Sequence, residues 1–284
     1  MWSPVNSMQT PFPADIKLDV PPLGEAWLEI RWQLKPMGPP GLLQDPDFPF
    51  ALGAFYALVK DRYPSKKDLA ASQAPLEILP HVVRHQFWRG DTSWPILQLG
   101  PGVASVNFTR PYSWADFKSE ALYLRSKLLS AYSSGLPQLD VVILRYLNAE
   151  PFEFSDKNVL EYLRSHLNTT LSLPPHVPGS FSGKPHPTSL HLQLSFDLQM
   201  PKGSGAIVLA TGARPLDPDL TQPSKPTNVA IWQLEVASGG TDAPVISDEP
   251  RFSAWLDAAH SAIHEWFFSF IDGTLRAQYS SQKG

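Results

Sequence analysis

Apolar and polar residues alternate most clearly in the segment GEAWLEIRWQL, residues 24–34. The even-numbered positions from Ala26 to Leu34 are apolar, whereas the odd-numbered positions carry Glu25, Trp27, Glu29, Arg31 and Gln33. A period of two residues is typical of a β-strand, whose side chains point alternately to the two faces of a sheet. The pattern predicts a strand with one buried face and one polar face.

Several later segments also have strand patterns. The segment LDVVILRYLN, residues 139–148, is apolar at almost every position, which is typical of a central strand buried on both faces. The other predicted strands are residues 81–90 and 94–109, as an antiparallel pair with a turn or bulge at 100–102, then 189–200, 205–215 and 228–236.

Four segments repeat apolar residues at helical spacing. They are residues 47–63, with Asp47 as cap and Pro49 in the first turn, then 114–132, with Ser113 and Asp116 as a capping box, then 158–171, and a final helix from about residue 248. The final helix carries an apolar stripe of Phe252, Leu256, Ala259, Ile263, Phe267 and Ile271. We expect these helices to pack on the predicted sheet.

The order of elements predicts an α+β fold built of two similar halves. The first half, about residues 20–136, has the order βαββα, and the second, about 137–280, has the order βαβββα. We expect one mostly antiparallel unit over residues 20–284, with helices packed on one face of the sheet. Residues 1–19 are predicted to be an irregular extension, and the Pro, Gly and Ser content of residues 173–188 predicts a flexible connector.

Composition narrows the class of protein. Hydrophobic residues make up 43% and charged residues 18% of the 284-residue chain, which is typical of a globular protein. A net charge of −4 disfavours nucleic-acid binding, and no apolar run approaches the roughly 18 residues of a membrane helix. The first 22 residues lack the pattern of a signal peptide, and the chain has no cysteine. These features predict a cytoplasmic protein.

The connector segment GSFSGKPHPTS, residues 179–189, resembles an active-site loop only superficially. Three residues, not four, separate Gly179 from Gly183, and Pro185 follows Lys184, which argues against a phosphate-binding loop. Phe181 occupies the position where a nucleophile elbow needs serine. We interpret the segment as a connector.

Four segments in order resemble a known family. They are PPLGEAWLEIRW at 21–32, LQLGPGVASVN with the following YSWADF at 97–117, LRYLN at 144–148, and LDAAHSAIHEWFFSFI at 256–271. Together they resemble a sporadically distributed family of uncharacterised bacterial proteins with a PPxxExxxEIRF-like start, a central RYxN strand and an LDxxHxxIxxxF-like last helix. The resemblance covers residues 21–279. It implies an architecture and a mobile or defence-associated setting, but it supplies no activity.

Five residues are candidates for binding a ligand. Arg145 and Asn148 interrupt the apolar central strand, and a buried arginine needs an acidic partner such as Glu25, Glu29 or Glu150. The alternatives for Arg145 are a structural ion pair and a contact to an anionic ligand in a cleft between the halves. Arg31 and Glu29 lie on the polar face of the first strand, where solvated charges are the simpler interpretation.

His260 is the fifth candidate. It lies four residues before His264 on the last helix, so the two rings could share a metal ion. The zinc-protease pattern needs Glu directly after the first histidine, and the chain has Ser261 there. The simpler interpretation is a half-exposed helix flank, with His260 bonded to Asp257.

The residues predict no catalytic group, no metal and no cofactor, because no motif is complete. Our first hypothesis is a non-catalytic interaction or regulatory protein with a protein partner, linked to bacterial defence or mobile elements. The alternatives are a sensor of a small anionic ligand and an enzyme of unrecognised type. A pocket containing Arg145 would favour the sensor, convergence of His260 with a carboxylate in a pocket would favour the enzyme, and an exposed apolar patch would favour the interaction protein.

Overall fold

The computed structural model describes residues 18, 21–38, 41–75, 79–133, 135–153, 157–174, 187, 189–214, 227–271 and 273–280. The predicted N-terminal extension at 1–19, apart from residue 18, lies outside the described residues. So does most of the predicted connector at 173–188.

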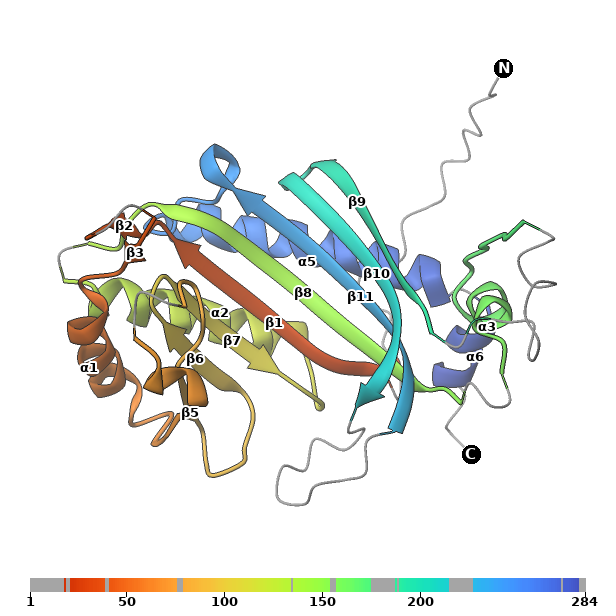
Figure 1. Cartoon of the computed structure of the whole chain (residues 1–284), viewed down its shortest axis with the longest axis horizontal. Helices are drawn as coiled ribbons and strands as arrows, with labels where there is room; N and C mark the ends of the chain where they lie inside the picture. Colours follow the sequence, from red (N-terminus) through yellow and green to blue (C-terminus); the bar gives the residue numbers. More distant parts are fainter. Residues whose placement is uncertain are drawn as a thin grey trace.

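The strands of the described residues form one large sheet and a small two-stranded ribbon (Figure 1). They are β1 Leu23–Trp32, β2 Lys35–Pro36, β3 Leu43–Gln44, β4 Ser65–Asp68, β5 His85–Trp88, β6 Ile96–Gly100, β7 Val103–Phe108, β8 Leu139–Pro151, β9 His191–Gln199, β10 Lys202–Arg214 and β11 Thr227–Gly239. The large sheet has nine strands in the order β4-β5-β6-β7-β1-β8-β11-β10-β9, and β2 pairs with β3 separately.

The two halves meet at the centre of the large sheet. β1 and β8 are antiparallel neighbours, with Glu29 opposite Ile143. On either side, the last strand of each half returns beside its first strand, so that β7 pairs with β1 and β11 pairs with β8. All of the strand pairs in this sheet are antiparallel. The α+β class and the central position of residues 139–148 are therefore as predicted.

The first half contains strands that the sequence pattern does not show. The run at residues 94–109 has the predicted turn at 100–102, where Gly102 has a positive φ of 72°, but the turn joins two separate strands, β6 and β7. A short strand, β4, adds the outermost position, and β2 and β3 lie between the predicted strand at 24–34 and the predicted helix at 47–63. Strands of two to four residues are too short to show a period.

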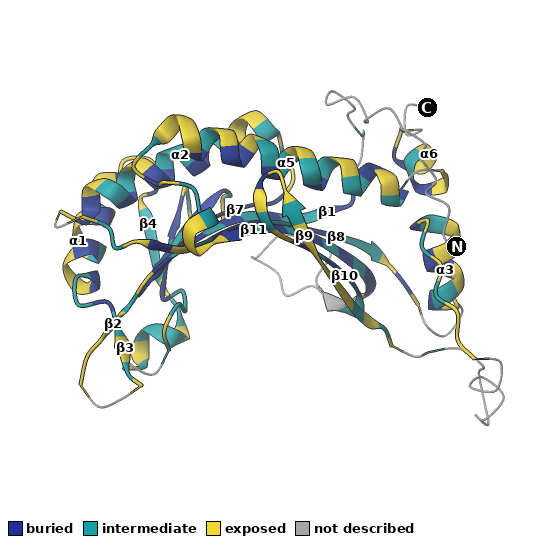
Figure 2. Cartoon of the chain, turned by 90° about the horizontal axis from the view of Figure 1, so that it is seen from above, coloured by how far each residue is buried: buried dark blue, intermediate teal, exposed yellow. Residues whose placement is uncertain are grey.

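The helices of the described residues are α1 Phe48–Val59, α2 Trp114–Ala131, α3 Val159–His166, α5 Glu249–Ile271 and α6 Thr274–Ser280, with short 3-10 turns at Ala70–Gln73 and Gly240–Asp242. Figure 2 shows α2 and α5 on the same face of the sheet. The sheet curves away from these helices, so its other face lies on the inside of the curve (Figure 2). None of these helices is long and apolar enough to cross a membrane.

Each long helix packs through its apolar stripe. The predicted stripe of α2 (Phe117, Ala121, Leu124, Leu128) is entirely buried. On α5, the predicted stripe residue Phe267 is only partly buried against the core, and the neighbouring Phe268 is fully buried. At this end of α5, the guanidinium of Arg276 on α6 lies 5.9 Å from the centre of the Phe268 ring.

One of the two predicted helix caps is confirmed, the other is not, and Asn158 forms a cap that was not predicted. Ser113 Oγ accepts a hydrogen bond from the backbone N–H of Asp116, as predicted for a capping box. Asn158 caps α3 in the same way, through Leu160. Asp47 precedes α1 but makes no side-chain cap, and α1 ends at Val59, earlier than predicted.

Candidate functional site

The five predicted site residues lie on opposite faces of the sheet. Arg31, Glu29 and Arg145 occupy the odd-numbered positions of β1 and β8, which face away from the helices. Asn148 is buried on the helix-covered face, and His260 belongs to α5, which packs on that face. The structure therefore does not bring these residues together in one site.

Arg145 forms an ion pair, but with a partner that sequence reasoning missed. Its Nε donates to Glu235, which lies directly opposite on β11, and its guanidinium lies 4.9 Å from the centre of the Trp27 ring. The expected partners Glu25, Glu29 and Glu150 are wrong. The pair is only partly buried, since the side chains of Arg145 and Glu235 are 22% and 20% exposed. Such a pair organises a strand pair rather than a binding cleft.

The other two candidates on the sheet also make local contacts. Arg31 Nε donates to Glu29 Oε1 over 2.5 Å on the helix-free face. Asn148 is 2% exposed, and its Nδ2 donates to the backbone carbonyl of Trp232 over 3.3 Å. These contacts account for the polar residues of the central strands without a ligand.

His260 belongs to a polar chain between α5 and the sheet. Its Nδ1 lies 3.0 Å from Tyr146 Oη, and its ring stacks on Trp114 with centroids 3.9 Å apart. Tyr146 Oη also bonds to Tyr112 Oη. The expected bond to Asp257 is wrong, because the Asp257 carboxylate accepts from Lys118 Nζ over 2.6 Å instead.

Burial keeps the three side chains linked by these hydrogen bonds, Tyr112, Tyr146 and His260, in their neutral forms. Burial lowers the pKa of His260 to about 4, and the neighbouring His264 lowers it further in the same direction. Burial raises the pKa values of Tyr112 and Tyr146 well above their usual range. His260 is thus a neutral packing and hydrogen-bonding group. The His260 and His264 ring centroids lie 5.9 Å apart, and no group of three or more metal-ligating side chains occurs among the described residues.

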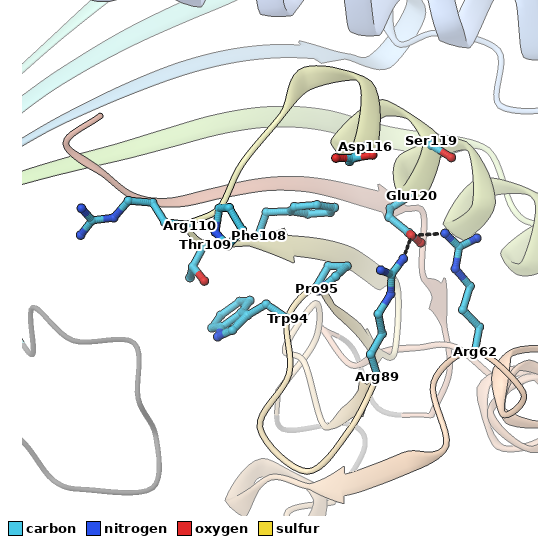
Figure 3. Close-up of a pocket in the computed structure, with 11 residues that line it drawn as sticks. Arg62, Arg89, Trp94, Pro95, Phe108, Thr109, Arg110, Asp116, Ser119 and Glu120 are labelled. Carbon is cyan, nitrogen blue, oxygen red and sulfur yellow. Dashed lines mark hydrogen bonds and ion pairs between the residues drawn. The ribbon is translucent and has the colours of Figure 1, made fainter. Parts of the chain in front are cut away.

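A pocket of about 320 Å³ lies elsewhere, in the first half of the chain (Figure 3). It lies where the loops after α1, β5 and β7 meet the first two turns of α2. The lining residues are Arg62, Arg89, Trp94, Pro95, Phe108, Thr109, Arg110, Pro111, Asp116, Ser119 and Glu120. None of the five predicted site residues lines it.

One end of the pocket is a cluster of two arginines around a buried carboxylate. Glu120 is 2% exposed, and its Oε1 accepts from Nη2 of both Arg62 and Arg89 (Figure 3). Its Oε2 accepts from Tyr63 Oη over 2.8 Å. The side chains of Arg62 and Arg89 are 40% and 36% exposed, so each guanidinium remains open to the pocket or to solvent. We call Arg62, Arg89 and Glu120 the arginine cluster.

Packing between α1 and α2 positions the arginine cluster. Arg62 follows α1, and its guanidinium lies 4.7 Å from the centre of the Tyr123 ring on α2. Tyr63 stacks on Tyr123 with centroids 6.2 Å apart, and burial raises the pKa of Tyr63 although the two arginines act in the opposite direction. Arg89 leaves the end of β5 and lies 5.7 Å from the Tyr63 ring. Aromatic rings thus orient both guanidiniums toward Glu120.

The other end of the pocket contains two hydrogen-bonding atoms without partners. Trp94 Nε1 and Thr109 Oγ1 are buried and make no hydrogen bond within the described residues. Thr109 is only 7% exposed. In Figure 3 both side chains lie at the end away from Arg62, with Pro95 and Phe108 between. Buried polar atoms are nearly always bonded, so this end of the pocket is suited to hold a polar group of a ligand.

Sequence reasoning missed this site although one signal was visible. Glu120 comes three residues after Phe117 and four before Leu124, so it lies on the apolar stripe of α2. A carboxylate on a buried helix face requires a cation or another strong donor. Arg89 lies in the aromatic-rich segment FWRGDTSW, residues 87–94. Those aromatics do pack across the hairpin, as Trp88 and Trp94 show with centroids 5.7 Å apart.

No family model, no curated protein and no solved structure matches the chain. The resemblance to the sporadically distributed bacterial family therefore stays a prediction from the sequence. What the chain does must be inferred from its own residues.

Proposed function

We propose that the protein binds a small oxyanion ligand in the pocket beside the arginine cluster, and that it does so without catalysing a reaction. The observation that carries the proposal is the arginine cluster. Two guanidiniums share one carboxylate, which leaves one unit of positive charge unbalanced at the end of a pocket. Arginine is well suited to phosphate and carboxylate groups, because its planar fork of five N–H donors matches their oxygens.

The pocket's other charges preserve this excess. Arg110 and Asp116 also line the pocket and carry opposite charges. Arg110 points away from the arginine cluster in Figure 3 and lies 3.5 Å from the Pro21 carbonyl. Asp116 is exposed at the first turn of α2, where its carboxylate accepts from Ser113 Oγ over 2.6 Å. The charged lining residues are three arginines and two carboxylates, so an incoming anion meets a pocket with one net positive charge.

This proposal keeps the sensor hypothesis but moves its site. The arginine that carries it is not Arg145, and the pocket lies within the first half rather than between the halves. A regulatory role, a cytoplasmic location and a link to bacterial defence remain proposals that rest on the sequence.

Titration calorimetry with inorganic phosphate and with malonate tests the proposal. The wild-type chain should bind at least one of these anions with a dissociation constant of about a millimolar or tighter. Arg89→Gln should weaken binding about tenfold or more, since one of the two guanidiniums is lost. Arg251→Gln is the matched control, because Arg251 pairs with Asp248 on the exposed side of α5. Equal affinity in the wild type and Arg89→Gln, or no binding at about 10 mM, contradicts the proposal.

A second candidate function, pairing with a second copy of the chain, is favoured by β9. This strand ends the sheet in the described residues, so its outer edge has no strand neighbour there. Leu194 and Phe196 are each 43% exposed, and β9 contains no proline or lysine to discourage pairing. Antiparallel pairing of two copies about Ser195 would place Leu194 opposite Phe196 and the acidic Asp197 opposite the neutral Gln193. The apolar residues would then share one face without a clash of like charges.

Sedimentation of the purified chain tests this second candidate. The wild type should be a dimer at about 100 µM. The double variant Leu194→Glu/Phe196→Glu should be a monomer, because it would place carboxylates opposite one another across the two-fold axis. Met200→Glu is the control, since Met200 is 79% exposed but lies beyond the strand. A monomeric wild type, or a dimeric double variant, contradicts pairing through β9.

A further inference from the structure

The unpartnered atoms of the pocket carry information about the ligand beyond its charge. Trp94 Nε1 and Thr109 Oγ1 are buried without a hydrogen bond in the described part of the chain, and both residues line the pocket. Only 7% of the surface of Thr109 is exposed. A buried N–H or O–H group that loses its hydrogen bond to water and gains no other is unfavourable. A ligand that supplies the missing hydrogen-bond partner therefore binds better than one that does not.

The two atoms differ in what they require. An indole N–H can only donate, so Trp94 needs an acceptor. A threonine hydroxyl can donate or accept, so Thr109 bonds either to a hydroxyl or to a carbonyl oxygen. The arginine cluster offers only donors beyond its bonds to Glu120. The pocket as a whole therefore presents donors at both ends and selects a ligand with acceptors at both ends.

The space between the two ends is apolar and small. Pro95 and Phe108 lie between them in Figure 3, and Pro111 also lines the pocket. The volume of about 320 Å³ corresponds to roughly ten water molecules. This space suits a short carbon skeleton rather than a second charged group. A ligand ammonium would be repelled by the guanidiniums and would find no acceptor in the indole.

We infer that the ligand is a short oxyanion that also carries a hydroxyl or carbonyl oxygen, such as a small phosphorylated polyol. Its anionic group binds Arg62 and Arg89, its carbon skeleton lies against Pro95 and Phe108, and its neutral oxygen bonds to Trp94 and Thr109. This inference rests on the proposed function, because it assigns the second end of the same pocket.

Calorimetry with three phosphates of similar size tests the inference. Glycerol phosphate carries hydroxyls, n-propyl phosphate has the same three-carbon skeleton without them, and phosphoethanolamine carries an ammonium. The wild type should bind glycerol phosphate about tenfold more tightly than propyl phosphate, and phosphoethanolamine most weakly. Trp94→Phe and, independently, Thr109→Val should reduce this preference to about twofold or less while propyl phosphate affinity stays the same. Two variants are used so that a folding defect in one does not decide the result.

The outcomes separate the two proposals. Equal binding of glycerol and propyl phosphates that depends on Arg89 overturns the inference and leaves the proposed function standing. A hydroxyl preference that persists in both Trp94→Phe and Thr109→Val also overturns it. Failure of all three phosphates to bind, or binding that Arg89→Gln does not change, overturns both the inference and the proposed function.

Discussion

The two halves share a strand order but use the same helix position differently. Glu120 is the seventh residue of α2, and Trp255 is the seventh residue of α5. Both side chains are buried, at 2% and 7% exposure. In the second half the position is filled by an indole, whose Nε1 donates to Ser238 Oγ over 2.9 Å. In the first half it carries a carboxylate that holds two arginines beside a pocket.

The difference teaches how a repeated framework acquires a site in only one copy. An aromatic side chain fills space and needs a single hydrogen bond, so it stabilises the helix–sheet contact directly. A buried carboxylate must be compensated by cations, which brings charged groups to a place where loops meet. We therefore regard the Trp255 position as structural and the Glu120 position as the functional one.

The largest expected effect is a loss of stability when Trp255, the residue with the structural role, is truncated. Trp255→Ala should lower the free energy of unfolding by about 3–5 kcal/mol, because it leaves a cavity between α5 and the sheet. Trp255→Phe should cost less, mainly through loss of the bond to Ser238. Denaturant unfolding measures both. A loss below about 1 kcal/mol for Trp255→Ala would remove the structural side of the comparison.

The contact between the two long helices should make stability depend on pH. His260 of α5 stacks on Trp114 of α2, and burial lowers the pKa of His260 to about 4. The unfolded chain takes up a proton near the usual histidine pKa of about 6.5, before the folded chain does, so stability falls as the pH drops between these values. The loss should approach about 3 kcal/mol near pH 4. Unfolding of the wild type and His260→Gln across this range measures the part due to His260, and parallel curves would contradict the expectation.

Neutralising the carboxylate of the first half should have a smaller effect. Glu120→Gln should lower the free energy of unfolding by about 2 kcal/mol, because Arg62 and Arg89 lose their shared acceptor but stay partly hydrated. Their exposed fractions of 40% and 36% are the reason that the full cost of a buried orphan charge is not expected. Glu249→Gln is the control, since Glu249 is 59% exposed and pairs with Arg125. A more stable Glu120→Gln variant that still binds phosphate would contradict the role assigned to Glu120.

The smallest effect is expected at the ion pair between β8 and β11. Arg145→Met should cost about 1 kcal/mol or less, because the cross-strand pair with Glu235 is partly exposed on both sides. Arg125→Met should cost more, since the Arg125 side chain is 6% exposed and donates to the Ile246 carbonyl over 2.6 Å. The same denaturant measurement ranks the two. A larger cost for Arg145 would mean that this cross-strand pair of the second half is one of the main stabilising contacts of the sheet.

Local sequence patterns predicted the elements in which each face is uniformly buried or in which the contacts join residues that are close in sequence. The even positions of β1 from Ala26 to Trp32 are all fully buried, as their alternation indicated. The capping box at Ser113 and the central strand at 139–148 were also readable, because a cap involves adjacent residues and a strand buried on both faces is apolar throughout. The short strands β2, β3 and β4 were not predicted, since they have too few residues to show a period.

The partners of charged residues were much harder to read. Arg145 was correctly expected to need an acidic partner, but its choice of Glu235 depends on β11 lying beside β8. The strand order decides this pairing, and 90 residues of sequence separate the two side chains. His260 was expected to bond within its own helix, yet it reaches Tyr146 on the sheet because α5 packs closely there.

The sequence by itself determined the class of fold, the order of the long elements and the need of each buried charge for a partner. These properties follow from hydrophobic periodicity and desolvation, which act on each residue wherever the chain takes it. Only the tertiary structure decided which charges meet. Arg62 and Arg89 lie 58 and 31 residues from Glu120, and they converge because the pairing of β7 with β1 and the packing of α1 on α2 bring three loops to one end of a helix. Attraction between charges is strong only over a few ångströms in a partly buried site, so the pocket exists only where the fold has already brought the chain together.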